Sequence, residues 1–248
     1  MNVAKRAILN TLRRLGYDLI AVPAAHDGNA YAGVRSSALY SPWNVDAEFL
    51  KAYALAKPNT LVDMLRLYEL WSLVGQSAKF VGDILEVGTW RGGSGAILAL
   101  RAKAAGLPCR VYLCDTFQGV VKTGANDAVY RGGEHADASR AAVEIFLHDD
   151  LQLENVTILE GIFPDQTGSA IENGRFRLCH IDVDVYQSAK DVTAWIWPRL
   201  VVGGMIVYDD YAFPNTAGIT KMVDEQRDLP DRITVYNLNG HAVVVKIS

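Results

Sequence analysis

The sequence predicts an α/β protein with a doubly wound, mostly parallel seven-stranded sheet, an antiparallel last strand and an N-terminal helical extension. From residue 82 onward, short apolar segments of strand length alternate with segments of helical periodicity. The apolar segments are nearly continuous, which is typical of parallel strands that helices cover on both faces. Near the C-terminus, Asn239-Gly240 separates two β-branched runs and predicts a tight turn within an antiparallel pair.

The composition is that of an ordinary globular protein. Among 248 residues, 50% are hydrophobic and 21% are charged, and the formal net charge is -4. No run of lysine or arginine stands out, so we expect no nucleic-acid partner. No apolar run approaches the roughly 20 residues of a membrane span. The three cysteines lie in or beside apolar runs, which favours reduced, buried thiols and a cytoplasmic location.

The N-terminal extension is expected to occupy residues 1–78, and the catalytic domain residues 79–248. Ile8, Leu12 and Leu15 recur at helical spacing, so residues 1–16 are expected to form an amphipathic helix. A role for this helix in docking or in a homodimer is favoured over membrane contact. The other expected elements of the extension are a long ordered loop over residues 20–45 and helices over Asp46–Ala56 and Asn59–Gln76, with Asn59 or Thr60 as the cap of the second helix.

The catalytic domain contains the remaining elements. The expected strands are residues 84–88, 110–115, 156–161, 176–184, 202–210, 233–238 and 242–247. The expected helices are Gly92–Ala105, Asp137–Asp149, Ser188–Trp197 (stopped by Pro198) and Ile219–Arg227. Residues 117–136 hold four glycines among many polar residues and are expected to form a mobile loop that closes over a ligand, although a solvated surface loop fits the same pattern. His135 and Tyr130 lie in this loop.

Ligands of such sheets bind beyond the carboxyl ends of the strands. The residues that this rule selects are Gly88, Asp115, Gly161, Asp182, Asp184, Asp209 and Asp210.

A glycine-rich turn follows the first of these strands, over residues 84–95. A dinucleotide site needs glycine where this turn has Trp90, because pyrophosphate approaches the backbone there. The G-K-[ST] of a phosphate loop is missing too. The turn therefore suits a ligand without phosphates, such as S-adenosylmethionine. The alternative is a structural turn that binds no ligand.

Polar residues around this turn match the groups of S-adenosylmethionine. Glu86 is expected to accept from the amine or to hold loop amides, Thr89 and Ser94 to meet the carboxylate, and Asp115 to accept from the ribose hydroxyls. The remaining candidates for cofactor binding are Gly88, Thr116, Phe117 and Gly161.

Aspartates gather at the ends of two later strands. Side chains alternate along a strand, so Asp182 and Asp184 share a face with His180 if the strand runs that far. Asp209 and Asp210 end the next strand. Carboxylates this close repel each other, and a hard divalent cation relieves the repulsion, with magnesium preferred over calcium or manganese. Helix capping is the alternative interpretation.

The aspartates and the donor together predict methyl transfer to a hydroxyl. A metal lowers the pKa of a coordinated hydroxyl, and a nearby base removes its proton. We assign Asp182, Asp209 and Asp210 to the metal, and Asp182 and Asp184 to catalysis, with Asp184 as the base. Asp209 and Asp210 can both be ligands only if their strand has ended before them.

The acceptor and the histidines are assigned from their position in the sheet. His180 lies deep in its strand and is expected to be a hydrogen-bonded core residue. The turn after the sixth strand should lie at the ligand edge, so Tyr211, Asn239 and His241 are the candidate acceptor residues, together with Asn237.

The chain resembles the macrocin O-methyltransferase (TylF-type) family from about residue 60 onward. The resemblance rests on ILEVGTWRGGSGA, CDTFQG, EGIFPDQ, HIDVDVYQSAKD and VGGMIVYDDY. It implies a Rossmann-like class I methyltransferase fold, S-adenosylmethionine and magnesium, and methylation of sugar or phenolic hydroxyls on natural products. The family's metal aspartates match Asp182, Asp209 and Asp210, its proposed base matches Asp184, and its cofactor acid matches Asp115. Residues 1–58 match nothing in the family, whose helices there often cover the acceptor.

Two other functions fit parts of the pattern. An NAD(P)-dependent oxidoreductase uses a similar sheet, but Trp90 argues against it. A noncatalytic module could keep the cofactor turn, but the complete set of aspartates argues against that. Fold similarity alone does not decide among them.

Overall fold

The computed structural model describes residues 8, 10–12, 14, 15 and 38–248. The chain divides into two units, Met1–Ala38 and Leu39–Ser248. In the first unit, residues 8, 10–12 and 14 are helical. The rest of the helix expected over residues 1–16, and most of the loop expected over residues 20–45, lies outside the described residues. The second unit contains the sheet.

The sheet has seven strands in the order β3-β2-β1-β4-β5-β7-β6. Their bounds are β1 Asp83–Val87, β2 Val111–Asp115, β3 Val156–Glu160, β4 Phe176–Ile181, β5 Leu200–Tyr208, β6 Arg232–Tyr236 and β7 Ala242–Lys246. The first five pair in parallel, and β7 is antiparallel to both β5 and β6. The predicted fold class, with its antiparallel last strand, is confirmed. The strand order reverses between β1 and β4, which is where such sheets bind ligands.

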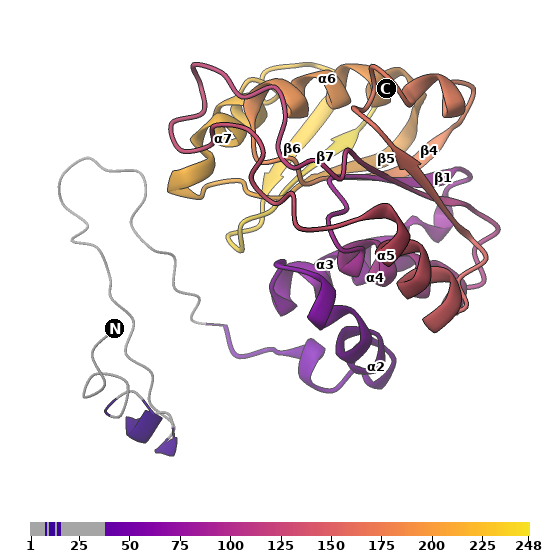
Figure 1. Cartoon of the computed structure of the whole chain (residues 1–248), viewed down its shortest axis with the longest axis vertical. Helices are drawn as coiled ribbons and strands as arrows, with labels where there is room; N and C mark the ends of the chain where they lie inside the picture. Colours follow the sequence, from indigo (N-terminus) through magenta and orange to yellow (C-terminus); the bar gives the residue numbers. More distant parts are fainter. Residues whose placement is uncertain (1–7, 9, 13, 16–37) are drawn as a thin grey trace. The chain divides into compact units, whose positions relative to one another are not determined.

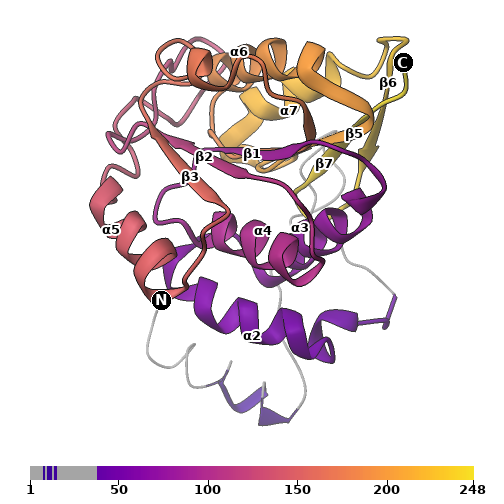
Figure 2. The same cartoon turned by 90° about the vertical axis from the view of Figure 1, so that its right-hand side faces the viewer.

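Helices cover both faces of the sheet (Figures 1 and 2). They are α2 Ala47–Ala56, α3 Met64–Gln76, α4 Gly93–Ala104, α5 Arg140–Glu144, α6 Tyr186–Ile196 and α7 Ala217–Asp224. Alternate strand residues serve the two faces: Ile84 packs in the core with α2, α3 and α4, and Leu85 packs in the core with α6 and α7. Both cores therefore meet the central strands from which the site is built.

Helices α2 and α3 share their core with the sheet. The buried ring of Phe49 contacts Tyr68 and Trp71, with centroids 4.9 and 5.9 Å apart. Both helices pack on α4 in the same cluster. The boundary expected after residue 78 thus falls within one continuous core. Helix α3 begins at Met64 rather than Asn59, because the carboxylate of Asp63 accepts from the amides of Leu65 and Arg66 at 2.8 and 3.2 Å.

Both strands that carry the aspartates end earlier than expected. β4 stops at Ile181 and β5 at Tyr208, so all four aspartates lie beyond the strand ends. Asp184 and Asp210 have φ of 62° and 60°, which is the left-handed region and not the β region. The condition for His180, Asp182 and Asp184 to share one strand face, a strand that runs to residue 184, is therefore not met. The condition for Asp209 and Asp210 to act together, a strand that has already ended, is met.

The loop over residues 117–136 has no helix or strand, as expected, but hydrogen bonds attach it to the domain. Buried Asp127 accepts from the amides of Gly124 and Tyr186, both at 2.9 Å. The bond to Tyr186 satisfies the first backbone amide of α6 with a side chain from the loop, and α6 begins at Tyr186 rather than Ser188. Ser188 donates to the carbonyl of Val121 at 2.9 Å. These contacts fix the part of the loop that faces the strand ends.

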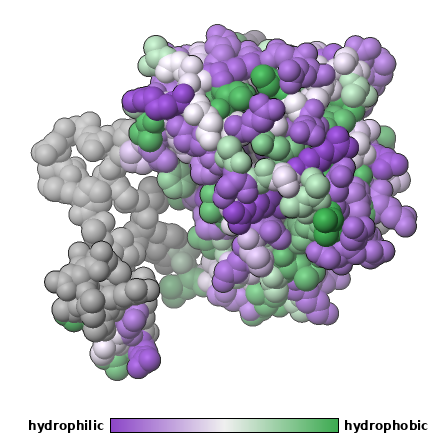
Figure 3. Space-filling view, viewed as in Figure 1, coloured by the Kyte–Doolittle hydropathy of each residue, from purple (hydrophilic) through white to green (hydrophobic). Residues whose placement is uncertain are grey.

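Helix ends differ from expectation elsewhere by a few residues. Ser139 caps α5, which then widens into a π-helical turn over Ile145–Asp150. Helix α7 begins at Ala217 and ends at Asp224, two to three residues before the predicted bounds. Polar and apolar residues are interspersed over the face seen in Figure 3. Among the described residues, no helix has both the length and the apolar character that crossing a membrane requires.

Candidate active site

A cavity of about 240 Å³ opens at the carboxyl ends of β1, β2, β4 and β5. The turn after β1, the start of α3 and the loop over residues 117–136 complete its walls. The residues predicted from sequence that line it are Gly88, Thr89, Ser94, Asp115, Thr116, Gly161, Asp182, Asp184, Asp209 and Asp210. Segments far apart in sequence therefore meet in one place, as the strand-end rule predicts.

The turn after β1 passes very close to the end of β4. A Cβ on Gly88, whose φ is 93°, would lie 1.6 Å from the carbonyl oxygen of Asp182, so only glycine fits. This contact brings the glycine-rich turn against the aspartates. Asp115 supports the turn from the neighbouring strand by accepting from the amides of Trp90 and Phe117, both at 2.7 Å. Burial raises its pKa, and the unused lone pairs of its carboxylate remain available to hydroxyls.

Glu86 and Phe117 stand outside the cavity lining. Glu86 is fully buried beneath the turn, where it accepts from Thr89 at 3.2 Å and contacts Nδ1 of His180 at 2.9 Å. Of its two expected roles, the geometry therefore corresponds to support of the loop rather than to contact with a ligand. Phe117 has φ of 52° and packs against the core.

The carboxylates of Asp182, Asp209 and Asp210 offer oxygens that all lie within 4.8 Å of one another. Burial and the negative charge of the neighbouring aspartates raise the pKa of Asp182 and of Asp210 well above the usual range. Such a cluster carries more negative charge than its surroundings balance. An all-oxygen donor set with excess negative charge fits a hard divalent cation such as magnesium.

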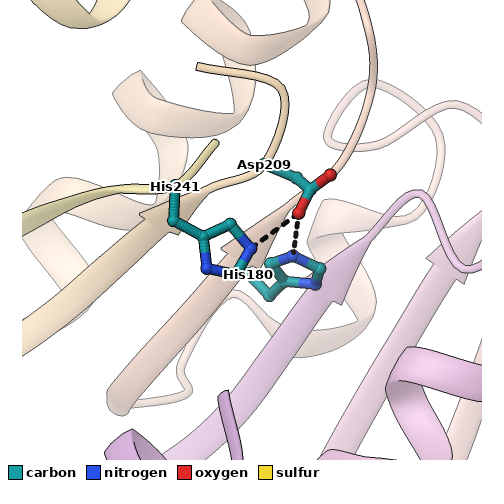
Figure 4. Close-up of side chains that lie close together, drawn as sticks. All are labelled: His180, Asp209 and His241. Carbon is teal, nitrogen blue, oxygen red and sulfur yellow. Dashed lines mark hydrogen bonds and ion pairs between the residues drawn. The ribbon is translucent and has the colours of Figure 1, made fainter. Parts of the chain in front are cut away.

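Asp209 differs from its neighbours because cations and donors surround it. Its Oδ1 lies 2.6 Å from Nε2 of His241 and 3.7 Å from Nε2 of His180, and Figure 4 shows both rings directed at it. Its Oδ2 accepts from the guanidinium of Arg66. Burial alone would raise the pKa of Asp209, but these contacts hold it well below its usual range. Asp209 is therefore the member of the cluster whose ionised form its contacts favour.

Asp184 lies at the rim of the cluster, beside the cavity. Burial raises its pKa, and the hydroxyl of Tyr130 donates to its Oδ1 at 2.6 Å. Both residues line the cavity, as does His135. A carboxylate with a raised pKa that faces a cavity is suited to accept a proton.

The candidate acceptor residues lie elsewhere. Tyr211, Asn239 and His241 are not among the residues that line the cavity. Tyr211 is buried and donates to Asp224 at 2.7 Å, Asn239 donates to Glu69 at 2.9 Å, and His241 is fully buried behind Asp209. The sheet edge was correctly predicted, but β7 runs back from it, so these side chains turn toward α3 and α7. His180 is fully buried and hydrogen-bonded, as expected.

Sequence reasoning did not identify the charged residues of α3. Arg66 and Glu69 reach the end of β5 and the turn before β7 over 143 and 172 positions of chain. In the sequence they look like the polar side of an amphipathic helix, and no local pattern distinguishes them. Asp127, which anchors the loop, was missed for the same reason.

Comparison with known proteins gives a consistent result. The profile of the family described as macrocin-O-methyltransferase (TylF) matches residues 56–244. Mycinamicin III 3''-O-methyltransferase of Micromonospora griseorubida is 30% identical over 195 residues, 73% of this chain and 76% of that protein. The 8-demethyl-8-(2,3-dimethoxy-alpha-L-rhamnosyl)-tetracenomycin-C 4'-O-methyltransferase of Streptomyces olivaceus is 34% identical over 140 residues, 53% of each chain, so this match spans about half of that relative's length.

Solved structures of methyltransferases are also similar to this chain. The O-methyltransferase NovP is 26% identical with a TM-score of 0.67, over 77% of this chain and 83% of that one. The calicheamicin methyltransferase CalS11 shares the fold, at 17% identity and a TM-score of 0.63, over 90% of this chain and 99% of that one. Because the family profile covers more than half of the chain, and the strand-end motifs that it spans converge on one cavity, the chain belongs to the macrocin O-methyltransferase (TylF) family.

Proposed function

We propose that this protein is a metal-dependent O-methyltransferase that moves a methyl group from S-adenosylmethionine to a sugar hydroxyl of a glycosylated natural product. The observation that carries the proposal is the meeting of four aspartates at the cavity wall, directly beside the glycine-rich turn. The glycine-rich turn suits a sulfonium donor, and the aspartates suit an acceptor hydroxyl that must lose a proton.

The donor is proposed to bind against the turn after β1. Thr89 and Ser94 line the cavity near the N-terminus of α4, where backbone amides and the helix dipole favour a carboxylate. Asp115 ends β2 and Gly161 follows β3, and both bound the side where a ribose would lie. Trp90 occupies the turn position that a pyrophosphate would need to approach, which disfavours a dinucleotide.

The cation is proposed to bind Asp182, Asp209 and Asp210. A bound divalent cation would lower the pKa of a coordinated acceptor hydroxyl. Asp209 and Asp182 come from the ends of adjacent strands, and the backbone of Asp209 is fixed there because its amide donates to the carbonyl of Ile181 at 2.9 Å. These residues would thus hold the acceptor oxygen in one position relative to the donor.

Asp184 is proposed to be the general base. The acceptor hydroxyl gives its proton to the carboxylate of Asp184 as its oxygen forms a bond to the methyl carbon. The bond between that carbon and the sulfonium sulfur breaks at the same time, and neutral S-adenosylhomocysteine leaves. A nearby carboxylate with a raised pKa suits this transfer better than a free one does, because its basicity lies closer to neutral pH.

A sugar is favoured as the acceptor over a phenol or catechol. The name of the Streptomyces olivaceus relative specifies a rhamnosyl-bearing tetracenomycin, and the name of the Micromonospora relative specifies the 3'' position of mycinamicin III. The described part of the helical region supplies Asn59–Val62, the segment between α2 and α3, to the cavity wall. That position agrees with the predicted role of this region as a cover over the acceptor.

The test is an assay with methyl-labelled S-adenosylmethionine and matched panels of rhamnosylated polyketides and simple catechols, each with magnesium and with excess EDTA. We expect transfer to a glycoside that depends on added magnesium. Methyl transfer to catechols alone would show that the acceptor is a catechol and not a sugar. Full activity in EDTA would remove the metal, and binding of NADH without binding of S-adenosylhomocysteine would refute the proposal as a whole.

The homodimer and the cytoplasmic location expected from the sequence stay predictions. Light scattering of the purified full chain tests the first, and fractionation of cells that express it tests the second. A monomer at all concentrations would contradict the dimer.

A further inference from the structure

Glu69 on α3 binds the turn that precedes β7. Its carboxylate accepts from the side-chain amides of Asn237 and Asn239, the latter at 2.9 Å, and lies 2.7 Å from Nδ1 of His241. The side chain of Glu69 is 17% exposed and that of His241 is fully buried. A buried charge of this kind is costly unless it is paired, and here it has three partners.

His241 continues the contact to the cluster of aspartates. With Nδ1 on Glu69, its other nitrogen, Nε2, lies 2.6 Å from Oδ1 of Asp209. Figure 4 shows the ring of His241 directed at this oxygen. An imidazole placed between two carboxylates can donate from both nitrogens, so the ring connects Glu69 to Asp209 directly.

The second oxygen of Asp209 also meets α3. Arg66, which precedes Glu69 by three positions on the same helix, donates to Oδ2 of Asp209 and to Oδ2 of Asp63. On the other flank, Nε2 of His180 is fully buried without a hydrogen-bond partner and lies 3.7 Å from Oδ1 of Asp209. Both oxygens of the Asp209 carboxylate are thus contacted by neighbouring side chains, and carboxylate oxygens of Asp182 and Asp210 lie within 4.8 Å.

We propose that Glu69 and His241 are positioning residues that orient Asp209 for a divalent cation. The inference rests on the proposed metal dependence and adds two residues that are not among those lining the cavity. Side chains behind a metal ligand typically fix its orientation, and removing one lowers metal affinity by about 10- to 100-fold. Helix α3 would in this way be coupled to the metal site as well as to the cavity wall.

A simpler role for the same contacts is to clamp the turn of residues 237–241 onto α3. The two roles use opposite nitrogens of His241: the clamp needs Nδ1, and positioning of Asp209 needs Nε2. Asparagine has its amide nitrogen as many bonds from the backbone as Nδ1, and glutamine has its amide nitrogen as many bonds away as Nε2. His241→Gln therefore keeps a donor for Asp209, and His241→Asn keeps a donor for Glu69.

The experiment is calorimetric titration of Mn²⁺ into the full chain saturated with S-adenosylhomocysteine. Wild type is compared with His241→Gln, His241→Asn, Glu69→Gln and, as a reference for a lost ligand, Asp209→Asn. Thermal unfolding in EDTA and the affinity for S-adenosylhomocysteine check that each variant is folded. We expect Mn²⁺ affinity to fall at least about tenfold in His241→Asn, to stay within about threefold of wild type in His241→Gln, and to fall severalfold in Glu69→Gln.

The outcomes separate this inference from the proposed function. If wild type binds no Mn²⁺, the metal-dependent mechanism fails and the positioning role fails with it. If wild type binds Mn²⁺ and both His241 variants bind Mn²⁺ as tightly as wild type does, only the positioning role is overturned. A loss confined to His241→Gln would assign the contacts to the clamp and also overturn positioning. If His241→Asn does not fold, Glu69→Gln decides, because unchanged affinity in that variant contradicts the proposal.

Discussion

The hydroxyl of Tyr130 donates to Oδ1 of Asp184 at 2.6 Å, and this bond joins the loop over residues 117–136 to the proposed base. Both side chains line the cavity. The hydrogen bond thus holds one oxygen of the Asp184 carboxylate at the loop. Under the proposed mechanism, this bond would give the loop a role in orienting the base.

Tyr130→Phe tests that role. Loss of a hydrogen bond to a charged group costs about 1.5–3 kcal/mol when the group is buried, and we expect the lower end at this half-open site. We predict that kcat falls about tenfold while the affinity for S-adenosylhomocysteine is unchanged. Steady-state kinetics and calorimetry measure the two quantities. In an Asp184→Asn background the same change should cost nothing further, and an additive loss would show that Tyr130 does not act through Asp184.

Asp184→Asn separates proton transfer from binding. The amide keeps the shape of the carboxylate but cannot accept the acceptor's proton, so we predict that turnover falls at least about a hundredfold. Binding of S-adenosylhomocysteine and of Mg²⁺ should both persist, because Asp184 is not among the three proposed ligands. Single-turnover kinetics and calorimetry measure these properties. Full activity in this variant would remove Asp184 from the mechanism.

Arg66 is the cation that the chain itself supplies to the aspartates. Its guanidinium pairs with Asp209, and its charge offsets part of the effect of burial and carboxylate repulsion that raises the pKa of Asp182 and of Asp210. Removing one partner of a buried ion pair costs about 3–5 kcal/mol. We predict that Arg66→Met lowers the free energy of unfolding in EDTA by about this amount, and that saturating Mg²⁺ restores much of the loss while binding more tightly than in wild type. Chemical denaturation with and without Mg²⁺ measures both effects, and an equal loss in the two conditions would contradict the electrostatic explanation.

The fold followed from sequence because periodicity is a local property. Continuous apolar segments such as Met205–Tyr208 specified the sheet, and the Asn239-Gly240 turn specified its antiparallel end. The aspartates were located for a related reason: they follow strands, and parallel strands end at one edge. Arg66, Glu69 and Asp127 could not be found in this way, since each acts on residues distant in sequence through the packing of a helix or loop. The side chains of Asn239 and His241 do not line the cavity, because their directions after β6 depend on where α3 lies.

Asp127 anchors the loop that carries Tyr130. It is 6% exposed and accepts from the amide of Tyr186, the first residue of α6. A Cβ on Gly218 would lie 2.3 Å from its Oδ1, so α7 also packs closely on it. We predict that Asp127→Ala lowers the free energy of unfolding by about 1–2 kcal/mol through the lost cap and lowers kcat as well. Denaturation and kinetics measure these. Asp191→Ala is the matched control, because Asp191 on α6 makes a partly exposed ion pair with Lys122 of the same loop. This variant should lower the free energy of unfolding and kcat by less than Asp127→Ala does.

The pH dependence of stability without metal should report on His180. Burial alone would lower its pKa, but contacts with Asp209 and Glu86 raise it to about 9, above the value of roughly 6.5 of an unfolded chain. A folded-state pKa above the unfolded value means that the stabilising contribution is complete below pH 6.5 and is lost as the pH rises to about 9. We therefore predict that the free energy of unfolding in EDTA falls across this interval, measured by urea denaturation at successive pH values. His180→Gln cannot titrate, so its curve should be flatter, whatever its absolute stability. Parallel curves for the two proteins would assign the slope to other groups, such as Asp182 and Asp210, whose raised pKa values act in the same direction.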